Sequence, residues 1–120
     1  MEPLLSILVV EDDSAVRNLV MRMLSDKGFA VWTAGTAYEA LHILKARLVD
    51  LLFADIIMPG MDGVDLAKEA RRLQPAIKVL FATGYAQLAT VRYAVGFGRV
   101  LYKPLREPEV VQAILQALAA

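Results

Sequence analysis

The stretch Ile7–Asp13, which reads ILVVEDD, passes directly from four apolar residues to three acids. An apolar run without polar alternation is typical of a strand that is covered on both faces of a parallel sheet. We therefore predict a first strand over Leu4–Val10, interrupted only by Ser6 and followed by carboxylates. Similar runs predict three more buried strands and a weaker one, rich in Val and aromatic residues, at Leu51–Ala54, Val79–Ala82, Val100–Tyr102 and Ala30–Ala34.

Between these runs the hydrophobic residues adopt the spacing of one-sided helices. The first helix begins behind Ser14 or Asp13, both of which are suitable N-caps, and its apolar stripe consists of Val16, Leu19, Val20, Met23 and Leu24. A weaker helix is expected over 86–95, and three more stripes lie at Ala40, Leu41 and Leu44, at Leu66, Ala67, Ala70 and Leu73, and at Val111, Ile114, Leu115 and Leu118. Five alternations of strand and helix indicate a parallel sheet with right-handed crossovers and helices on both faces.

Length and charge restrict the classes of function. We take residues 1–120 as one domain, since 120 residues are too few for two comfortable ones. Thirteen Lys and Arg balance thirteen Asp and Glu, which disfavours direct binding to nucleic acid or to an anionic membrane. The absence of Cys fits a reducing compartment, and the apolar runs are far shorter than the roughly 20 residues of a membrane span. We expect a cytoplasmic protein.

Several polar residues share one position, just past the carboxyl end of a predicted strand: Glu11, Asp12, Asp55, Thr83 and Lys103. In an open doubly wound sheet these ends lie on one edge, and ligands bind there where the strand order reverses. If the order is 2-1-3-4-5, the first and third strands are neighbours. Their acids, Asp12 and Asp55, then meet in one cleft.

Carboxylates this close together require a cation. At an effective dielectric constant of about 20, two unit charges about 4 Å apart repel each other by about 4 kcal/mol. Mg²⁺ prefers oxygen ligands, binds one or two carboxylates and completes its shell with water and phosphate oxygen. Glu11 and Asp12 would hold the ion, and Asp55 would be both ligand and nucleophile. Lys103 would neutralise an incoming phosphoryl group, to which Thr83 offers a hydroxyl.

Each element also has an ordinary structural explanation. A run of acids after a strand is often the solvated start of a helix, and Thr-Gly and Lys-Pro pairs are often only a turn and a loop. Arg17 is long enough to reach the acidic cleft, although a solvated position on its helix is equally compatible. His42 lies on a predicted surface helix away from the strand ends, so we do not expect it to be catalytic. The combination at four strand ends favours a functional site.

Over essentially its whole length the sequence resembles the receiver domain of two-component response regulators. The resemblance lies in ILVVEDD at 7–13, DIIMPGMDG at 55–63, FATGY at 81–85 and YKP at 102–104. The acidic pair of the family corresponds to Glu11 and Asp12, and its phosphorylated aspartate corresponds to Asp55. Its hydroxyl residue and its lysine correspond to Thr83 and Lys103.

The resemblance implies a flavodoxin-like α/β fold, a doubly wound five-stranded parallel sheet of order 2-1-3-4-5 with five helices. It implies a phosphorelay receiver that takes a phosphoryl group from a histidine kinase or histidine phosphotransfer protein onto Asp55, requires Mg²⁺, and signals through a protein–protein surface. Such a domain catalyses its own aspartyl phosphorylation and dephosphorylation but is mainly a signalling switch. By the same resemblance, Ile57 lends a backbone carbonyl to the metal ion, and the Lys103–Pro104 bond is cis.

One position departs from the family pattern. Receivers commonly carry Tyr or Phe three residues before the lysine, and this chain has Val100 there. Tyr102 has the same parity as Val100 in an extended strand, so we predict that Tyr102 or Tyr85 replaces the missing aromatic. The runs at 81–85 and 100–104 resemble both stand-alone receivers and receivers fused to hybrid histidine kinases, and the sequence does not separate these subgroups.

The last strand and its flanking helices form a candidate surface for partner docking or homodimerisation, with the apolar residues Leu88, Val91, Tyr93, Val95, Leu101 and Leu105.

Among rival functions, a flavin carrier needs a loop rich in hydroxyl groups and glycine after the first strand. A magnesium phosphatase needs an Asp-x-Asp motif on that strand, and a Toprim-type nuclease needs one later. The remaining alternative is a non-phosphorylated pseudo-receiver that acts as a binding module, and the complete set of five polar residues argues against it.

Overall fold

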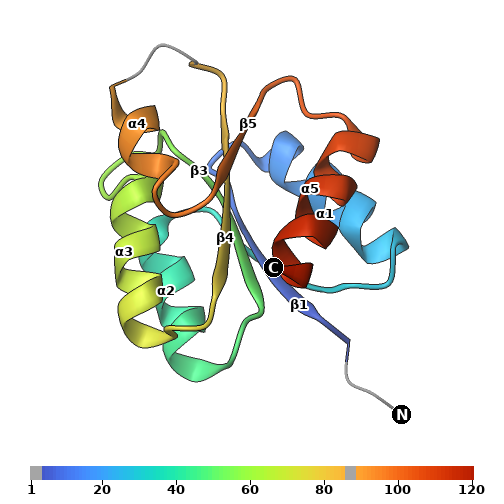
Figure 1. The fold of residues 1–120 in the computed structure, drawn as a ribbon, viewed down its shortest axis with the longest axis horizontal. Helices are drawn as coiled ribbons and strands as arrows, with labels where there is room; N and C mark the ends of the chain where they lie inside the picture. The colour runs from blue at the N-terminus through green and yellow to red at the C-terminus, as the bar shows by residue number, and fades with distance from the viewer. Residues whose placement is uncertain (1–3, 86–88) are drawn as a thin grey trace.

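The computed structural model describes residues 4–85 and 89–120 and shows a parallel five-stranded sheet between two layers of helices (Figure 1). The strand order β2-β1-β3-β4-β5 confirms the predicted flavodoxin-like fold. The strands are β1 (Ser6–Val10), β2 (Ala30–Ala34), β3 (Leu51–Asp55), β4 (Lys78–Thr83) and β5 (Arg99–Tyr102). The helices are α1 (Ser14–Asp26), α2 (Ala37–Ala46), α3 (Gly63–Leu73), α4 (Thr90–Ala94) and α5 (Glu107–Ala119).

Helices α1 and α5 cover one face of the sheet, and α2, α3 and α4 cover the other (Figure 1). Alternate residues of β1 therefore belong to different cores: Ile7 and Val9 pack with α1 and α5, whereas Leu8 and Val10 pack with the opposite layer. Because both faces are buried, the middle residues of the central strands are apolar, and polar residues such as Ser6 and Lys78 stand at the strand ends. This requirement explains the uninterrupted run before the acids at the end of β1.

The first helix begins where an acid caps it. Asp13, rather than Ser14, is the N-cap of α1: its backbone is extended, and its Oδ1 accepts hydrogen bonds from the N–H groups of Ala15 and Val16 at 2.9 and 3.2 Å. An N-cap carboxylate satisfies amides that have no partner within the helix. The chain thus turns from β1 into α1 within three residues and keeps Glu11 and Asp12 at the strand end.

The predicted elements differ from the observed ones in several details, and the strand ends of β3, β4 and β5 differ by one residue. Leu4 and Leu5 are exposed, and β1 begins only at Ser6, where the strand enters the sheet. Leu19 is 52% exposed, so the apolar stripe of α1 is narrower than predicted. Of the helix expected over 86–95, residues 86–88 lie outside the described part, and α4 spans Thr90–Ala94.

A buried side chain at the end of α3 joins this helix to the end of α2 and to the connection that follows it. Gln74, at the end of α3, donates from Nε2 to the carbonyls of Leu44 and Arg47 at 2.9 and 2.8 Å. Its Oε1 accepts from the N–H of Val49 at 2.9 Å. These contacts satisfy backbone groups of the connection between α2 and β3, so they fix the entry of the strand that ends in Asp55.

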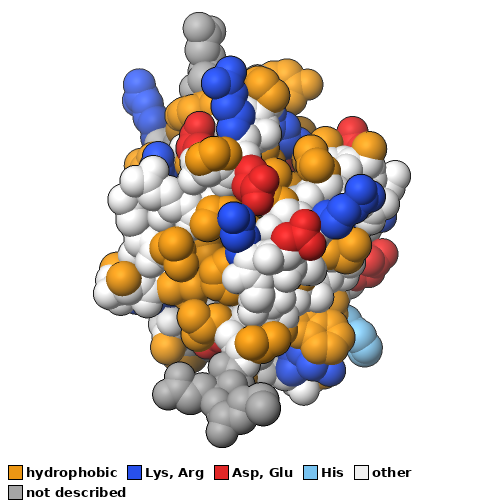
Figure 2. Space-filling model, turned by 90° about the vertical axis from the view of Figure 1, so that its right-hand side faces the viewer, with side chains coloured by type: hydrophobic (Ala, Val, Ile, Leu, Met, Phe, Trp, Pro, Cys, Tyr) orange, Lys and Arg blue, Asp and Glu red, His pale blue; other side chains and the backbone are white. Residues whose placement is uncertain are grey.

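The face formed by α1 and α5 is mixed in character (Figure 2). Exposed Leu19 and Leu115 lie on these helices, and Lys27 and Glu107 form an ion pair at 3.8 Å between the end of one and the start of the other. In Figure 2, charged side chains interrupt the hydrophobic ones across this face. Among the described residues, no helix has the length and hydropathy that a bilayer crossing requires.

Candidate functional site

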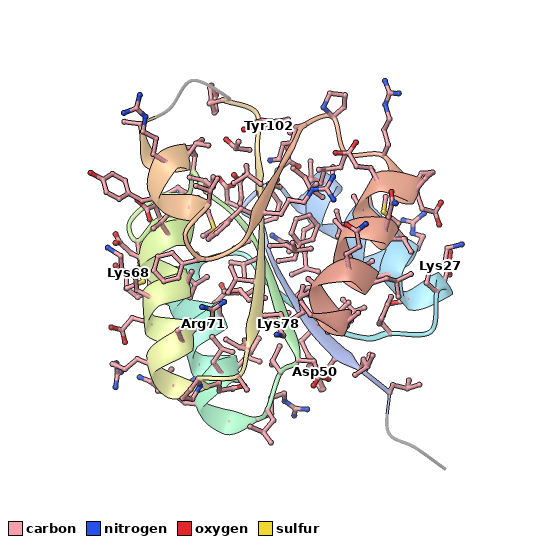
Figure 3. All side chains as sticks on the ribbon, in the orientation of Figure 1. Lys27, Asp50, Lys68, Arg71, Lys78 and Tyr102 are labelled. Carbon is pink, nitrogen blue, oxygen red and sulfur yellow. The ribbon has the colours of Figure 1, made fainter. Side chains whose placement is uncertain are left out.

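The register of the sheet brings the ends of four strands to one level. Val10 pairs with Ala54, so Glu11 and Asp55 follow directly on neighbouring strands. Thr83 pairs with Tyr102, and the N–H of Lys103 donates to the carbonyl of Thr83 at 2.8 Å. We call this side of the sheet the carboxyl edge. It lies at the top of Figures 1 and 3, since β1 rises from the N-terminal side at the bottom.

Three acids meet at the carboxyl edge. Glu11, Asp12 and Asp55 each offer a carboxylate oxygen, and these atoms all lie within 4.8 Å of one another. Glu11 and Asp55 are only 4% and 8% exposed, whereas Asp12 is exposed to solvent. The group therefore has two buried carboxylates and one that is open to solvent.

Lys103 lies between two of the acids. Its Nζ is 2.5 Å from Oε1 of Glu11 and 2.8 Å from Oδ2 of Asp55. Burial raises the pKa of Glu11 to about 7, the nearby Asp55 carboxylate adds to this effect, and Lys103 opposes it. Burial disfavours the charged form of Lys103, but its hydrogen bonds and charge interactions with Asp55 and Glu11 outweigh burial, and its pKa is raised. Lys103 therefore stays a cation.

The group of acids fits a hard divalent cation. Among the described residues, Oε2 of Glu11 is the buried side-chain oxygen that has no hydrogen-bond partner. An unpaired buried carboxylate oxygen is costly unless it binds a cation or a proton. Oxygen donors from two buried acids and one exposed acid, with open space beside them, are what Mg²⁺ needs while it keeps several waters.

An open cleft of about 470 Å³ gives access to Asp55. Oδ1 of Asp55 accepts from the N–H of Ile57 at 3.1 Å, so one oxygen is held by backbone and the other by Lys103. Ile57 and Tyr85 are 41% and 63% exposed and form the apolar part of the rim. The structure therefore fixes the orientation of the carboxylate and leaves room for a donor group above it.

Thr83 is completely buried at the end of β4. Its Oγ1 accepts from the N–H of Tyr85 at 3.1 Å, which leaves the hydroxyl hydrogen free to donate. Unlike Glu11, Asp12, Asp55, Ile57 and Lys103, Thr83 does not line the cleft. To reach a ligand above Asp55, its hydroxyl must therefore turn away from the Tyr85 amide.

The position that departs from the family pattern is filled by packing. Val100 is 9% exposed and belongs to the core on the α2, α3 and α4 side. Tyr102, two residues further on, is 46% exposed and lies at the carboxyl edge (Figure 3). The Lys103–Pro104 peptide bond is cis, as predicted.

Two residues at the site act through the backbone. A Cβ on Gly63 would overlap the carbonyl oxygen of Asp55, and the N–H of Gly63 donates to the carbonyl of Ile56 at 2.9 Å. Arg17 donates from a guanidinium nitrogen to the carbonyl of Glu11 at 2.8 Å. The sequence indicated that Arg17 can reach the cleft, but it gave no sign of the close approach at Gly63. His42 is exposed on α2.

Comparisons with known proteins agree with this geometry. The family model described as the response regulator receiver domain matches residues 7–115. The response regulator receiver protein CpdR of Brucella abortus (strain 2308) is 34% identical over 116 residues, which cover 95% of this chain and 97% of CpdR. Sensor kinase CckA of the same organism is 40% identical over 89 residues, which cover 72% of this chain but only 9% of CckA.

Solved structures agree as well. The response regulator receiver domain protein (CheY-like) from Methanospirillum hungatei JF-1 has a TM-score of 0.92 at 30% identity, with 98% of this chain and 95% of that chain covered. The shared fold and the family match over most of its length show that the chain belongs to the response regulator receiver domain family of two-component systems.

Proposed function

We propose that this receiver accepts a phosphoryl group on Asp55 from a phosphohistidine of a histidine kinase or phosphotransfer protein, in a reaction that depends on Mg²⁺. The observation that carries the proposal is the environment of the Asp55 carboxylate. It is held at 2.8 Å from the Lys103 ammonium and within 4.8 Å of two further acids, at the floor of an open cleft.

In the proposed transfer, a carboxylate oxygen of Asp55 attacks phosphorus. A P–O bond forms, the P–N bond to the donor histidine breaks, and the imidazole leaves with the electron pair of that bond. Lys103 stays beside the carboxylate and neutralises the charge that the phosphoryl oxygens bring. Bound to Glu11, Asp12, Asp55 and the backbone carbonyl of Ile57, Mg²⁺ would supply further positive charge to those oxygens.

Two groups complete the proposed site from neighbouring segments. The N–H of Ile57 holds one oxygen of Asp55, which orients the carboxylate before the donor arrives. The hydroxyl of Thr83 would donate to a phosphoryl oxygen after it turns away from the Tyr85 amide. The first group is in place before the donor arrives, whereas the second must turn toward it.

Intact mass spectrometry tests this function. The chain is incubated with Mg²⁺ and a small phosphodonor such as acetyl phosphate, beside Asp55→Asn and the control Asp26→Asn, which changes an exposed acid at the end of α1. The wild type and the control should gain one phosphoryl group, and Asp55→Asn should gain none. No gain in the wild type, with either this donor or phosphohistidine, would leave the pseudo-receiver that only binds protein.

For the change that phosphorylation causes in partner binding, we propose that Tyr102 or Tyr85 takes the role of the aromatic residue that other receivers carry at the position of Val100. Both tyrosines are exposed, and each directly neighbours or contacts a residue of the site, Lys103 and Thr83 respectively. If the double variant Tyr102→Ala and Tyr85→Ala keeps the full effect of phosphorylation on affinity for the cognate protein partner, this assignment is wrong.

Homodimerisation through α4, β5 and α5 stays a prediction. On that face Tyr93 and Val95 are exposed, Leu101 is buried, and Leu88 lies outside the described residues.

A further inference from the structure

Arg17 contacts the acidic site through the backbone of Glu11 and not through its carboxylate. It is half-buried on α1, and its guanidinium donates to the carbonyl of Glu11 at 2.8 Å. That carbonyl belongs to the peptide unit between Glu11 and Asp12, which is planar. A hydrogen bond that holds this plane sets the direction in which both acids leave the backbone.

The backbone N–H of Glu11 is also held by a hydrogen bond. Its N–H donates to the carbonyl of Ala34, at the end of β2, at 3.1 Å. Glu11 is thus held on one side by the neighbouring strand and on the other by Arg17. Arg17 thereby restrains the carbonyl of Glu11, which lies beyond Val10, the last residue of the strand.

The guanidinium itself is confined by the loop after β2. A Cβ on Gly35 would lie only 3.1 Å from a terminal nitrogen of Arg17. Two hydrogen bonds hold this loop: the N–H of Gly35 donates to Oε2 of Glu39 at 3.1 Å, and the N–H of Glu39 donates to Oγ1 of the N-cap Thr36 at 3.1 Å. Arg17 therefore fits between a carbonyl and a glycine, in a space that a side chain at position 35 would reduce.

We infer that Arg17 is a positioning residue for the Mg²⁺-binding acids, an inference that rests on the proposed Mg²⁺ site. Partners of this kind, one step removed from the metal, typically change metal affinity by about 10- to 100-fold when they are removed. Charge alone predicts the opposite sign. Removal of a nearby cation should tighten Mg²⁺ binding, because the like charges of Arg17 and Mg²⁺ no longer repel each other.

The sign of the change therefore separates the two roles of Arg17. Isothermal titration with Mg²⁺ is carried out on the wild type, Arg17→Ala, Arg17→Lys and Arg22→Ala, the last being an exposed arginine of the same helix. We expect Arg17→Ala to weaken Mg²⁺ binding about tenfold, Arg17→Lys to restore part of the affinity through its ammonium donor, and Arg22→Ala to change it less than twofold.

A second variant protects the test against misfolding. Gly35→Ala keeps the charge of Arg17 but presses on its guanidinium, and we expect it to weaken Mg²⁺ binding about threefold in a protein whose metal-free Tm shows that it is folded. Unchanged or tighter binding by folded Arg17→Ala, or by Gly35→Ala if Arg17→Ala does not fold, would overturn the inference while the wild type still binds Mg²⁺. A wild type that does not bind Mg²⁺ would instead overturn the proposed function and this inference with it.

Discussion

Acidification should weaken the binding of Mg²⁺ because Glu11 becomes protonated. Burial raises the pKa of Glu11 from an ordinary 4.5 to about 7 in the metal-free protein. Only the ionised carboxylate can bind a metal ion, so Mg²⁺ competes with a proton at this residue. The perturbation is simply a change of pH between 6 and 8, a range in which an unperturbed glutamate stays ionised throughout.

The magnitude follows from the pKa. With a value of about 7, the Glu11 carboxyl is about 90% ionised at pH 8, half ionised at pH 7 and about 10% ionised at pH 6. The apparent affinity for Mg²⁺ should therefore fall about tenfold from pH 8 to pH 6. Binding should also release protons: about 0.1 per Mg²⁺ at pH 8, about 0.5 at pH 7 and about 0.9 at pH 6.

Isothermal titration in two buffers with different ionisation enthalpies measures both quantities, because the difference in apparent heat reports the protons released. Glu11→Gln is the matched control, since it keeps the size of the side chain but cannot titrate. Its Mg²⁺ binding should be weaker and should lose the proton release assigned to Glu11. If the wild type binds Mg²⁺ with the same affinity from pH 6 to pH 8 and releases no protons, the reasoning about Glu11 is refuted.

The same shift has the opposite consequence for the metal-free fold. A pKa that is higher in the folded protein than in the unfolded chain means that folding favours the protonated form. The contribution of Glu11 to stability is then fully present below pH 4.5 and is lost as the pH rises through about 7. Mg²⁺ should restore stability most strongly at pH 8, where the Glu11 carboxylate is ionised and its Oε2 has no hydrogen-bond partner.

Three substitutions test how the fold holds the site. Gly63→Ala should destabilise the protein by about 1–3 kcal/mol in urea unfolding and lower the rate of phosphorylation, because a Cβ there overlaps the Asp55 carbonyl; unchanged values for both would contradict the close approach. Gln74→Leu should cost about 3 kcal/mol because it leaves buried backbone groups without partners, and a loss below about 1 kcal/mol would show that water replaces the side chain. Asp13→Ala should cost about 1 kcal/mol through loss of the α1 cap, whereas Asp26→Ala at the other end should not, and equal losses would argue against capping.

The sheet could be predicted from sequence because one physical requirement acts on every residue of a strand. A central strand covered on both faces has no solvent side, so its middle residues are apolar and polar residues appear at its ends. This rule placed Asp55 and Lys103 at strand ends. The parallel topology then brought them to one edge, where their side chains lie 2.8 Å apart.

Positions at the boundary between core and solvent were harder to predict. Asp and Ser have similar preferences for the N-cap, so the sequence did not decide between Asp13 and Ser14. Leu19 fits the helical period, but at 100° per residue it lies about 90° from the centre of the buried stripe of α1, where burial depends on the neighbouring helix. It remains exposed because that neighbour does not cover it.

Contacts between different elements of the fold left no signal in the local sequence pattern. Gly63 is needed because the start of α3 passes against the end of β3, and Gln74 is needed because α3 ends beside the connection after α2. Neither requirement changes the hydrophobic period or the turn chemistry around the residue. The buried position of Thr83 likewise depends on the loop that follows it, whose amide at Tyr85 holds the hydroxyl.

The charges of the site explain why it needs one fixed cation and one exchangeable cation. With Glu11 ionised, three carboxylates and Lys103 carry a net charge of about −2, which a divalent ion cancels. Under the proposed function, a phosphoryl group on Asp55 would replace one negative charge by about two, so the phosphorylated site would carry about −1 even with both cations present. Without Lys103 it would reach about −2 in a partly buried cleft. Under the proposed function, Lys103 would therefore be required after phosphorylation as well as before it, and its backbone N–H, which donates to the carbonyl of Thr83, ties it to the end of β4.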